Sequence, residues 1–428
     1  MTFKEKVKKF IPRFILSIYH FCWALLGAVV FACLPAGRVF QKNKFKIIGI
    51  TGTSGKTTTT HLTTAILQEA GYKVASISSV RFKIGEKEWE NKYKMSMPGR
   101  FVIQKFLWQA CLPAGRQKKP CDFVVLEVTS EGIRQFRHRF IDFDTVVFTN
   151  LSPEHIESHG GFENYKKEKL KLFKAAKNIH VINGDDKNAE DFLKIPAKQK
   201  IVFGINDAKN LNLKLQLVGD FNVMNALAAM NVAMAYGVSL ETCKKTLEKA
   251  KSISGRMEVV TVPPQRDPAR GGKSPIKVVV DYAHTPEQLE SVYKTFKEEP
   301  LICVLGSCGG GRDKWKRPVL GQLAKKYCKE IILTNEDPYD EDPLYIIKEI
   351  ENALLNDGVV KHQIILDRGR AIEKAVALAK PGDCVIITGK GSEPWMCVAN
   401  NKKIPWSDKE IVKEMLKKSY PSIKNSPS

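Results

Sequence analysis

The chain has ten cysteines among its 428 residues but contains no Cys-x-x-Cys pair. Cys303 and Cys308 are the closest two, and they flank a glycine-rich turn. Most of the others lie in apolar runs, as small core residues do. This usage argues against a zinc ribbon and a disulfide framework, and it favours a reducing cytosol.

Acidic residues are also scarce relative to basic ones. The formal net charge is +22, and the lysines are scattered along the chain rather than gathered in one block. A basic surface suits phosphorylated or multiply carboxylated substrates, or an anionic membrane face. Because the sequence has no aromatic–basic RNA motif and no helix-turn-helix pattern, charge alone does not favour a nucleic acid as the partner.

A glycine-rich run follows the short apolar strand Ile47-Ile48 and leads into a helical pattern. Backbone N–H groups of such a turn close around phosphate oxygens, and the helix N-terminus adds positive charge. We expect Lys56 to reach the terminal phosphates and the Thr57 hydroxyl to hold Mg²⁺, although Ile50 stands where the first glycine of the usual motif belongs. The predicted nucleotide-binding residues are Gly52, Thr53, Ser54, Gly55, Lys56, Thr57 and Thr58.

Alternating apolar strands and helices predict two α/β domains. A chain of this length is too long for one core, and buried strands alternating with helices imply a mostly parallel sheet covered on both faces. We expect a segment 1–44, a central ATP-binding domain 45–254 of the P-loop ATPase type, and a Rossmann-like C-terminal domain 255–428. Predicted strands include 123–126, 145–148, 180–182, 277–280, 301–305, 330–333 and 383–387.

The segment before the glycine-rich turn is apolar. No charged residue occurs from Phe14 to Ala36, a length that could span a bilayer. An interfacial helix or re-entrant hairpin, a helix packed on the catalytic domain, and a full span all stay open. A full span would place the preceding cations (Lys4, Lys6, Lys8, Lys9 and Arg13) outside, against the positive-inside tendency.

Two polar groups follow later strands. Glu127 ends an apolar strand, where a carboxylate is well placed to bind Mg²⁺; the less favoured alternative is an ordinary strand-end residue. The stretch from Glu154 to His159 holds two histidines and two acids, which could bind metal or form a polar surface loop.

The order of these motifs resembles the Mur ligases, the ATP-dependent amide-bond-forming enzymes of peptidoglycan synthesis. The matching runs are Thr-Gly-Thr-Ser-Gly-Lys-Thr-Thr (51–58), Glu-Val-Thr-Ser (127–130), Thr-Asn-Leu-Ser-Pro-Glu-His (149–155) and Tyr-Lys-Lys-Glu-Lys (165–169). Later matches are Ser-Gly-Arg-Met-Glu (254–258), Asp-Tyr-Ala-His-Thr-Pro (281–286), Gly-Gly-Gly-Arg-Asp-Lys (309–314) and Gly-Lys-Gly-Ser-Glu (389–393). The later motifs look most like the tripeptide synthetases, which add the third amino acid of the stem peptide.

The resemblance implies a role for each matching residue. ATP would convert the acceptor carboxylate to an acyl phosphate, and an amine would displace phosphate. Thr57, Glu127, His155 and Lys169 would support Mg²⁺, with Lys169 carbamylated by CO₂; without the resemblance Lys169 reads as a solvated helix lysine. Nucleotide contacts would come from Asn225, Arg256, Asp281 and His284, acceptor contacts from Thr129, Ser130, Gln135 and Arg137, and amino-acid contacts from Arg312, Asp337, Tyr339, Gly389 and Glu393.

The sequence departs from the family at two places. Glu336-Asp337-Pro338-Tyr339 stands where diaminopimelate-adding enzymes have Asp-Asn-Pro-Arg, so we expect Asp337 to attract a cationic side chain and the amino acid to be lysine, ornithine or another diamine. About forty-five residues precede the phosphate loop, too few for the family's uridine-binding domain. The chain could bind the nucleotide sugar poorly, use a partner subunit that supplies uridine binding, or act at a membrane.

Three functional readings remain. The first is a tripeptide-synthetase-like ligase acting on a muramoyl dipeptide, in the cytoplasm or at the inner face of the membrane. The second is a related ligase with a lipid-linked or polyglutamate acceptor. The third, from another class, is a nucleotide-binding scaffold that has lost catalysis. The third is disfavoured because the residues that catalysis would need are all present: Lys56, Glu127, His155, Lys169 and Arg312.

Overall fold

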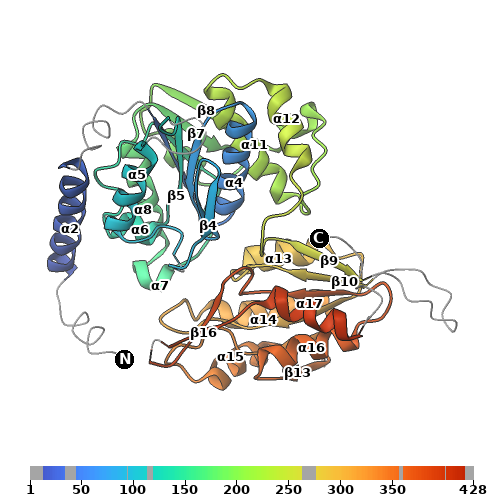
Figure 1. Ribbon diagram of the computed structural model, residues 1–428. Coiled ribbons are helices and arrows are strands. Elements are labelled where there is room, and N and C mark those ends of the chain that lie inside the picture. Colours follow the sequence, from blue (N-terminus) through green and yellow to red (C-terminus); the bar gives the residue numbers. More distant parts are fainter. Residues whose placement is uncertain are drawn as a thin grey trace. The chain divides into compact units, whose positions relative to one another are not determined.

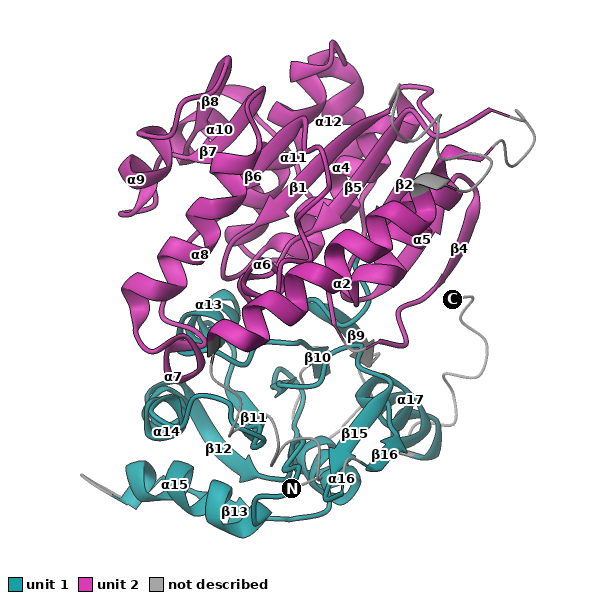
Figure 2. Ribbon diagram, turned by 90° about the vertical axis from the view of Figure 1, so that its left-hand side faces the viewer, with its two compact units in different colours: residues 1, 252–428 teal, residues 2–251 magenta. Residues whose placement is uncertain are grey.

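The structure, a computed structural model, describes residues 13–33, 45–93, 95–112, 119–262, 276–355, 360–400 and 402–419. It divides the chain into two compact units, Thr2–Lys251 and Ser252–Ser428 (Figures 1 and 2). The cations Lys4, Lys6, Lys8 and Lys9 lie outside the described residues.

An eight-stranded sheet with the order β4-β3-β2-β5-β1-β6-β7-β8 forms the first unit. Six strands run parallel, and β3 and β4 extend one edge in the antiparallel sense. The bounds are β1 (Lys46–Thr51), β2 (Val74–Ile77), β3 (Arg81–Ile84), β4 (Lys87–Glu90), β5 (Phe123–Glu127), β6 (Thr145–Phe148), β7 (Ile179–Asn183) and β8 (Gln199–Phe203). The mostly parallel sheet expected from the sequence is confirmed.

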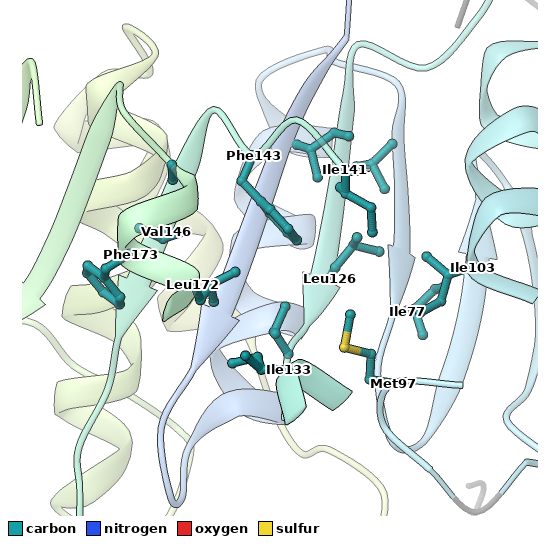
Figure 3. Close-up of a cluster of buried hydrophobic side chains, with 14 of the residues drawn as sticks. Ile77, Met97, Ile103, Leu126, Ile133, Ile141, Phe143, Val146, Leu172 and Phe173 are labelled. Carbon is teal, nitrogen blue, oxygen red and sulfur yellow. The ribbon is translucent and has the colours of Figure 1, made fainter. Parts of the chain in front are cut away.

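Successive strand residues face opposite sides of this sheet, and each side has its own core. Ile47 and Val124 belong to one cluster, whereas their neighbours Ile48 and Val125 belong to the other. Figure 3 shows the first cluster. It also takes side chains from α5 (Arg100–Cys111), α6 (Ser130–Arg134) and α8 (Phe162–Ala175), and the second takes side chains from α4 (Lys56–Glu69), α11 (Phe221–Ala235) and α12 (Leu240–Lys249). Shorter helices are α7 (Ile156–His159), α9 (Ala189–Leu193) and α10 (Ile205–Leu211).

Tertiary packing, rather than helix propensity, holds the helix that follows the glycine-rich turn. α4 contains six threonines, which are weak helix formers. Thr57 to Thr60 are buried, and the helix packs against α11, where the small residues Ala226, Ala228 and Ala229 are fully buried. This contact fixes the start of α4, and therefore the turn before it.

The N-terminal helix α2 (Arg13–Cys33) packs against α5 in the same unit (Figure 2). Its segment Phe14–Phe31 is long and apolar enough to cross a membrane, and 11% of it is buried. Of the arrangements left open by the sequence, the structure shows a helix packed on the first unit.

The second unit has a six-stranded sheet with the order β13-β12-β11-β14-β10-β9, in which only β9 is antiparallel to its neighbour. Its elements are β9 (Glu258–Val262), β10 (Ile276–Val280), α13 (Pro286–Thr295), β11 (Leu301–Leu305), α14 (Lys316–Tyr327), β12 (Cys328–Leu333), α15 (Pro343–Leu355), β13 (His362–Ile364), α16 (Arg368–Leu378), β14 (Cys384–Ile387) and α17 (Asp408–Ser419). A separate hairpin pairs β15 (Trp395–Val398) with β16 (Lys402–Pro405). The expected second parallel α/β sheet is confirmed.

Candidate active site

The glycine-rich turn lies between the C-terminal end of β1 and the start of α4, at the centre of the first sheet. Gly55 precedes α4 with φ of 79°, a left-handed conformation that favours glycine, and no side chain caps the helix. Lys56 folds back over the turn, and its Nζ donates to the carbonyls of Gly52 (2.9 Å) and Thr53 (2.7 Å). An uncapped helix N-terminus beside a lysine is an anion site.

Two hydroxyls and one carboxylate meet beside this turn. Thr57 Oγ1 donates to Glu127 Oε2 at 3.0 Å and lies 2.8 Å from Ser79 Oγ. The backbone N–H of Ser79 also donates to Glu127 Oε2, at 2.9 Å. These are the hard oxygen donors that Mg²⁺ prefers, so the residues fit that ion.

The loop after β6 holds the turn in place. Thr149 Oγ1 donates to the Ser54 carbonyl at 2.7 Å, and Asn150 Oδ1 accepts from the Ser54 N–H and hydroxyl. Thr53 is buried, and its hydroxyl lies 2.9 Å from Tyr165 OH. Thr53 therefore ties the turn to α8, which carries Lys169.

Lys169 is 1% exposed and is not a solvated helix lysine. Its Nζ donates to the Gly52 carbonyl at 2.8 Å and lies 4.7 Å from the Tyr165 ring centre. Burial, together with the nearby Lys56, holds the pKa of Lys169 well below its usual range, whereas Glu154 acts in the opposite sense. This direction of shift favours the uncharged amine, which is the form of lysine that reacts with CO₂.

His155 begins the short helix α7 with φ of 56°, an unusual backbone conformation for a non-glycine residue. Its Nε2 lies 3.6 Å from Glu154 Oε1, and its ring lies 6.5 Å from that of Tyr165. His159 is more deeply buried, with Nε2 3.2 Å from Ser130 Oγ. The structure thus brings both His155 and Lys169 close to the Tyr165 ring. Within the described residues, no three His, Cys, Asp or Glu side chains form a metal cluster.

The predicted acceptor residues lie on α6 and the loop that follows it. Thr129 caps α6 by accepting from the Gly132 N–H, and Gln135 Oε1 accepts from Arg137 at 2.8 Å. Arg100 on α5 joins them, because its Nε donates to the Gln135 carbonyl at 3.0 Å. Burial lowers the pKa of both Arg100 and Arg137, and Arg137 lowers that of Arg100 further. Two partly desolvated guanidinium groups this close favour an anionic acceptor.

Asn225 lies in the interior of the first unit. A side-chain carbon on Gly55 would stand 2.1 Å from Asn225 Oδ1, so the asparagine closes on the glycine-rich turn. Its Nδ2 donates to Asn222 Oδ1 at 3.1 Å. The role at adenine that the resemblance implies for Asn225 stays a prediction.

In the second unit the predicted nucleotide residues lie near the end of β10. The Asp281 carboxylate accepts from the N–H groups of Met257 (2.7 Å) and Ala283 (2.6 Å). Burial raises the pKa of Asp281, whereas Arg256 opposes the shift. The Arg256 guanidinium stacks 4.3 Å over the Tyr282 ring, and His284 Nδ1 lies 2.8 Å from the Tyr282 carbonyl. Their contacts with nucleotide stay predictions.

The predicted amino-acid residues surround a buried lysine that the sequence did not assign. Lys390 is fully buried, and its Nζ donates to both oxygens of Asp337 at 2.9 Å, to Glu393 Oε2 at 2.6 Å and to the Trp395 carbonyl at 2.7 Å. The N–H of Cys397 also donates to Asp337. Asp337, 2% exposed, is therefore neutralised by Lys390. The ammonium of Lys390 thus already occupies the carboxylate that was expected to attract a cationic substrate side chain, and that role stays a prediction.

The remaining residues of this group are also placed by packing. A side-chain carbon on Gly389 would stand 2.0 Å from Glu336 Oε2, so only glycine leaves room for this carboxylate. Tyr339, with φ of 53°, packs its ring against Gly310. Arg312 is exposed and follows the glycine run 309–311. Glu393 accepts from Tyr282 OH at 3.0 Å, which joins the group to the strand end that carries Asp281.

Sequence reasoning missed Ser79, Arg100 and Lys390. Ser79 follows β2, which adjoins β5 in the sheet, so a strand order would have placed it beside Glu127. Arg100 and Lys390 give no such signal, because only tertiary packing brings them to Gln135 and Asp337.

Comparison with known proteins decides the family. Residues 50–211 match the Mur ligase middle domain, and residues 255–391 match the Mur ligase glutamate ligase domain. The chain belongs to the Mur ligase family. It is thus an ATP-dependent ligase, as the resemblance implied.

Individual relatives of this Mur ligase carry more specific names. It is 35% identical over 404 residues to UDP-N-acetylmuramoyl-L-alanyl-D-glutamate–2,6-diaminopimelate ligase 1 of Clostridium acetobutylicum, covering 88% of this chain and 79% of that protein. It is 34% identical over 410 residues to UDP-N-acetylmuramyl-tripeptide synthetase of Roseiflexus, covering 85% and 77%.

Solved structures agree on the fold. A UDP-N-acetylmuramoyl-L-alanyl-D-glutamate–2,6-diaminopimelate ligase superposes with a TM-score of 0.56 at 27% identity, covering 90% of this chain and 81% of that one. A pseudomurein peptide ligase type C from Methanothermus fervidus gives 0.61 at 18% identity over 90% and 80%, a likeness of fold alone.

Proposed function

We propose that this Mur ligase joins a diamino acid to the D-Glu carboxylate of UDP-N-acetylmuramoyl-L-Ala-D-Glu, with release of ADP and phosphate. The supporting observation is the buried, hydrogen-bonded Lys169 at the glycine-rich turn, next to the Thr57–Glu127 pair. The names of the relatives support the substrates. We propose the cytoplasm as the location, because the reaction consumes ATP.

The proposed reaction has two steps. An acceptor carboxylate oxygen attacks the γ-phosphorus of ATP, the bond to the β-phosphate oxygen breaks, and ADP leaves. The uncharged amine then attacks the acyl carbon, the carbon–oxygen bond to phosphate breaks, and a proton leaves the nitrogen. Lys56 would orient the phosphates and offset their charge, since its Nζ already spans the turn.

Mg²⁺ would neutralise charge that builds on the phosphate oxygens. Thr57, Glu127 and Ser79 would hold one ion, and His155 with a carbamylated Lys169 would support a second. Carbamylation forms a bond between Lys169 Nζ and the carbon of CO₂, with loss of one proton from the nitrogen. Burial of Lys169 shifts its pKa downward, in the direction that favours the uncharged amine this step needs.

Acceptor and amino acid would meet separate groups. Arg100, Arg137 and Gln135 would bind acceptor carboxylates, and Arg312 would pair with the α-carboxylate of the incoming amino acid. Because Lys390 pairs with Asp337, this carboxylate favours lysine over diaminopimelate less than its sequence position suggests. We therefore favour diaminopimelate, which the relatives' names also carry. Uridine binding by a partner, and membrane contact through residues 1–44, remain part of this proposal.

The test incubates purified full-length protein with ATP, Mg²⁺ and UDP-N-acetylmuramoyl-L-Ala-D-Glu, with single amino acids in turn, and reads products by mass. A product heavier by one amino-acid residue, with matching phosphate release, supports the proposal and identifies the amino acid. Lys56→Ala should abolish the product, and exposed Lys374→Ala serves as the matched control. ATP binding without any product would favour another acceptor or a scaffold.

A further inference from the structure

Helix α2 presents a wide apolar surface to solvent. Phe14 is 65% exposed, Ile18 58%, Val29 49% and Leu25 43%, and these positions recur at helical spacing. The segment Phe14–Phe31 has a mean hydropathy of 2.0 and contains no charged residue. An uninterrupted apolar face of this kind marks a site of contact with a partner or a membrane.

The other side of α2 is fixed to α5. Ala24 is buried, and a side-chain carbon on Gly27 would stand 3.8 Å from the Phe101 ring. Aromatic rings extend this contact between α2 and α5. The ring centres of Trp23 and Phe101 lie 5.5 Å apart, and those of Phe31 and Trp108 lie 6.3 Å apart. Crossing a bilayer would pull α2 away from α5 and expose these rings. The packed helix therefore lies along the surface of its unit (Figure 2).

The loop after α6 extends this apolar surface and adds charge. The ring of Phe21 lies 5.5 Å from that of Phe140, which is 40% exposed. Arg139, exposed, sits 6.0 Å from the ring centre of Phe136. Five cations from Lys4 to Arg13 precede the apolar segment in the sequence. Aromatic and basic residues beside an apolar helix match an anionic membrane interface.

The same loop carries two of the proposed acceptor residues. Phe136 and Phe140 adopt φ of 57° and 59°, a strained conformation for aromatic residues. The Phe21 ring touches both, at 6.1 and 5.5 Å, and Gln104 Nε2 donates to the Phe140 carbonyl at 3.5 Å. Arg137 lies between Phe136 and Phe140 in the sequence, so the contacts of Phe21 support the loop that carries it.

We propose that the outer face of α2, with Phe140 and Arg139, lies in the plane of an anionic phospholipid bilayer and holds the acceptor loop at the membrane surface. Arg139 pairs with lipid phosphates while the apolar side chains enter the acyl boundary. Membrane docking stands without the proposed ligase activity. Only the effect on the acceptor rests on that activity.

Vesicle flotation tests the docking. The full-length protein is mixed with phosphatidylcholine vesicles, with or without phosphatidylglycerol. It should float with the anionic vesicles, and the triple change Ile18→Gln, Leu25→Gln, Val29→Gln should weaken partitioning at least about tenfold. The control Val202→Gln, Leu344→Gln removes exposed apolar side chains elsewhere and should float normally. Equal flotation of the triple variant, or none of the wild type, overturns the proposal.

Two further measurements test orientation and coupling. Alkaline extraction should release the protein, because an in-plane helix is peripheral; retention in the pellet would show a span and overturn the in-plane arrangement. On anionic vesicles, Phe21→Ala should raise the KM for the acceptor several-fold and leave the KM for ATP unchanged. The conservative variant Phe21→Leu should have an acceptor KM close to that of the wild type. An unchanged acceptor KM overturns the positioning role. Absence of ligase activity in the wild type would refute the proposed function and leave flotation intact.

Discussion

The buried pair of Lys390 and Asp337 allows a sharp prediction of stability. Both side chains are 2% exposed or less. Lys390→Met keeps the length of the chain but removes the ammonium that binds Asp337, Glu393 and the Trp395 carbonyl. Breaking one partner of a buried ion pair costs about 3–5 kcal/mol, because the other charge stays buried without compensation.

Scanning calorimetry of the full chain measures the effect. About 2–4 °C of melting temperature is lost per kcal/mol in a unit of this size, so Lys390→Met should lower the transition of the second unit by about 6–20 °C. Asp337→Asn should cost less, about 1–3 kcal/mol, because the uncharged amide leaves Lys390 with Glu393. The double variant should be more stable than the sum of the single changes predicts.

Exposed Lys374→Met provides the control and should leave the transition in place. A cost below about 1 kcal/mol for Lys390→Met would refute the reasoning, since it would mean that Asp337 is not held as a buried carboxylate. In that case the acidic group would again be available to a cationic substrate, and lysine would return as the expected amino acid.

Three further outcomes are expected. Glu127→Gln should raise the Mg²⁺ concentration for half-maximal turnover by at least about tenfold, and an unchanged Mg²⁺ titration would count against this site. Lys169→Ala should lose turnover and regain part of it when a short carboxylate is added to the solution. A native mass spectrum of the wild type that lacks the mass increment of one bound CO₂ would speak against carbamylation. Burial, with help from Arg139 and Lys171, lowers the pKa of His138 to about 4; since the unfolded chain binds that proton near pH 6.5, the free energy of unfolding should fall as pH drops from about 6.5 to 4. His138→Gln should flatten that slope in urea titrations at several pH values, and an equal slope would exclude His138 as its source.

The sequence predicts the parallel sheets because each strand is a short, continuous apolar run. Residues 145–148 were expected as a strand and form β6 with the same bounds. The glycine-rich turn is equally readable, since its chemistry lies in consecutive residues. The roles at Lys56 and Thr57 therefore rest on local pattern, and the turn's position at the centre of the sheet follows from strand order.

Features that depend on tertiary contacts cannot be predicted from local sequence patterns. Lys169 sits in a lysine-rich stretch, and only the packing of α8 on the glycine-rich turn buries it. From the sequence, Asp337 looks like an accessible acidic group. In the structure Lys390, fifty-three positions later, donates hydrogen bonds to its carboxylate. The apolar run at Phe14–Phe31 permits several placements by composition, and the choice depends on Phe101 and Trp108 of α5.

The closing of Asn225 on Gly55 bears on how the chain matures during translation. The glycine-rich turn leaves the ribosome early. The loop after β6, whose Thr149 bonds the turn, is made about a hundred residues later, and α11 is made later still. Until α11 packs on α4, the buried threonines of α4 lack their cover. A nascent chain stopped before residue 225 therefore carries the nucleotide motif and its contacts from Thr149 and Asn150, but it lacks the helix that covers α4. ATP binding should therefore tighten once the whole first unit has emerged.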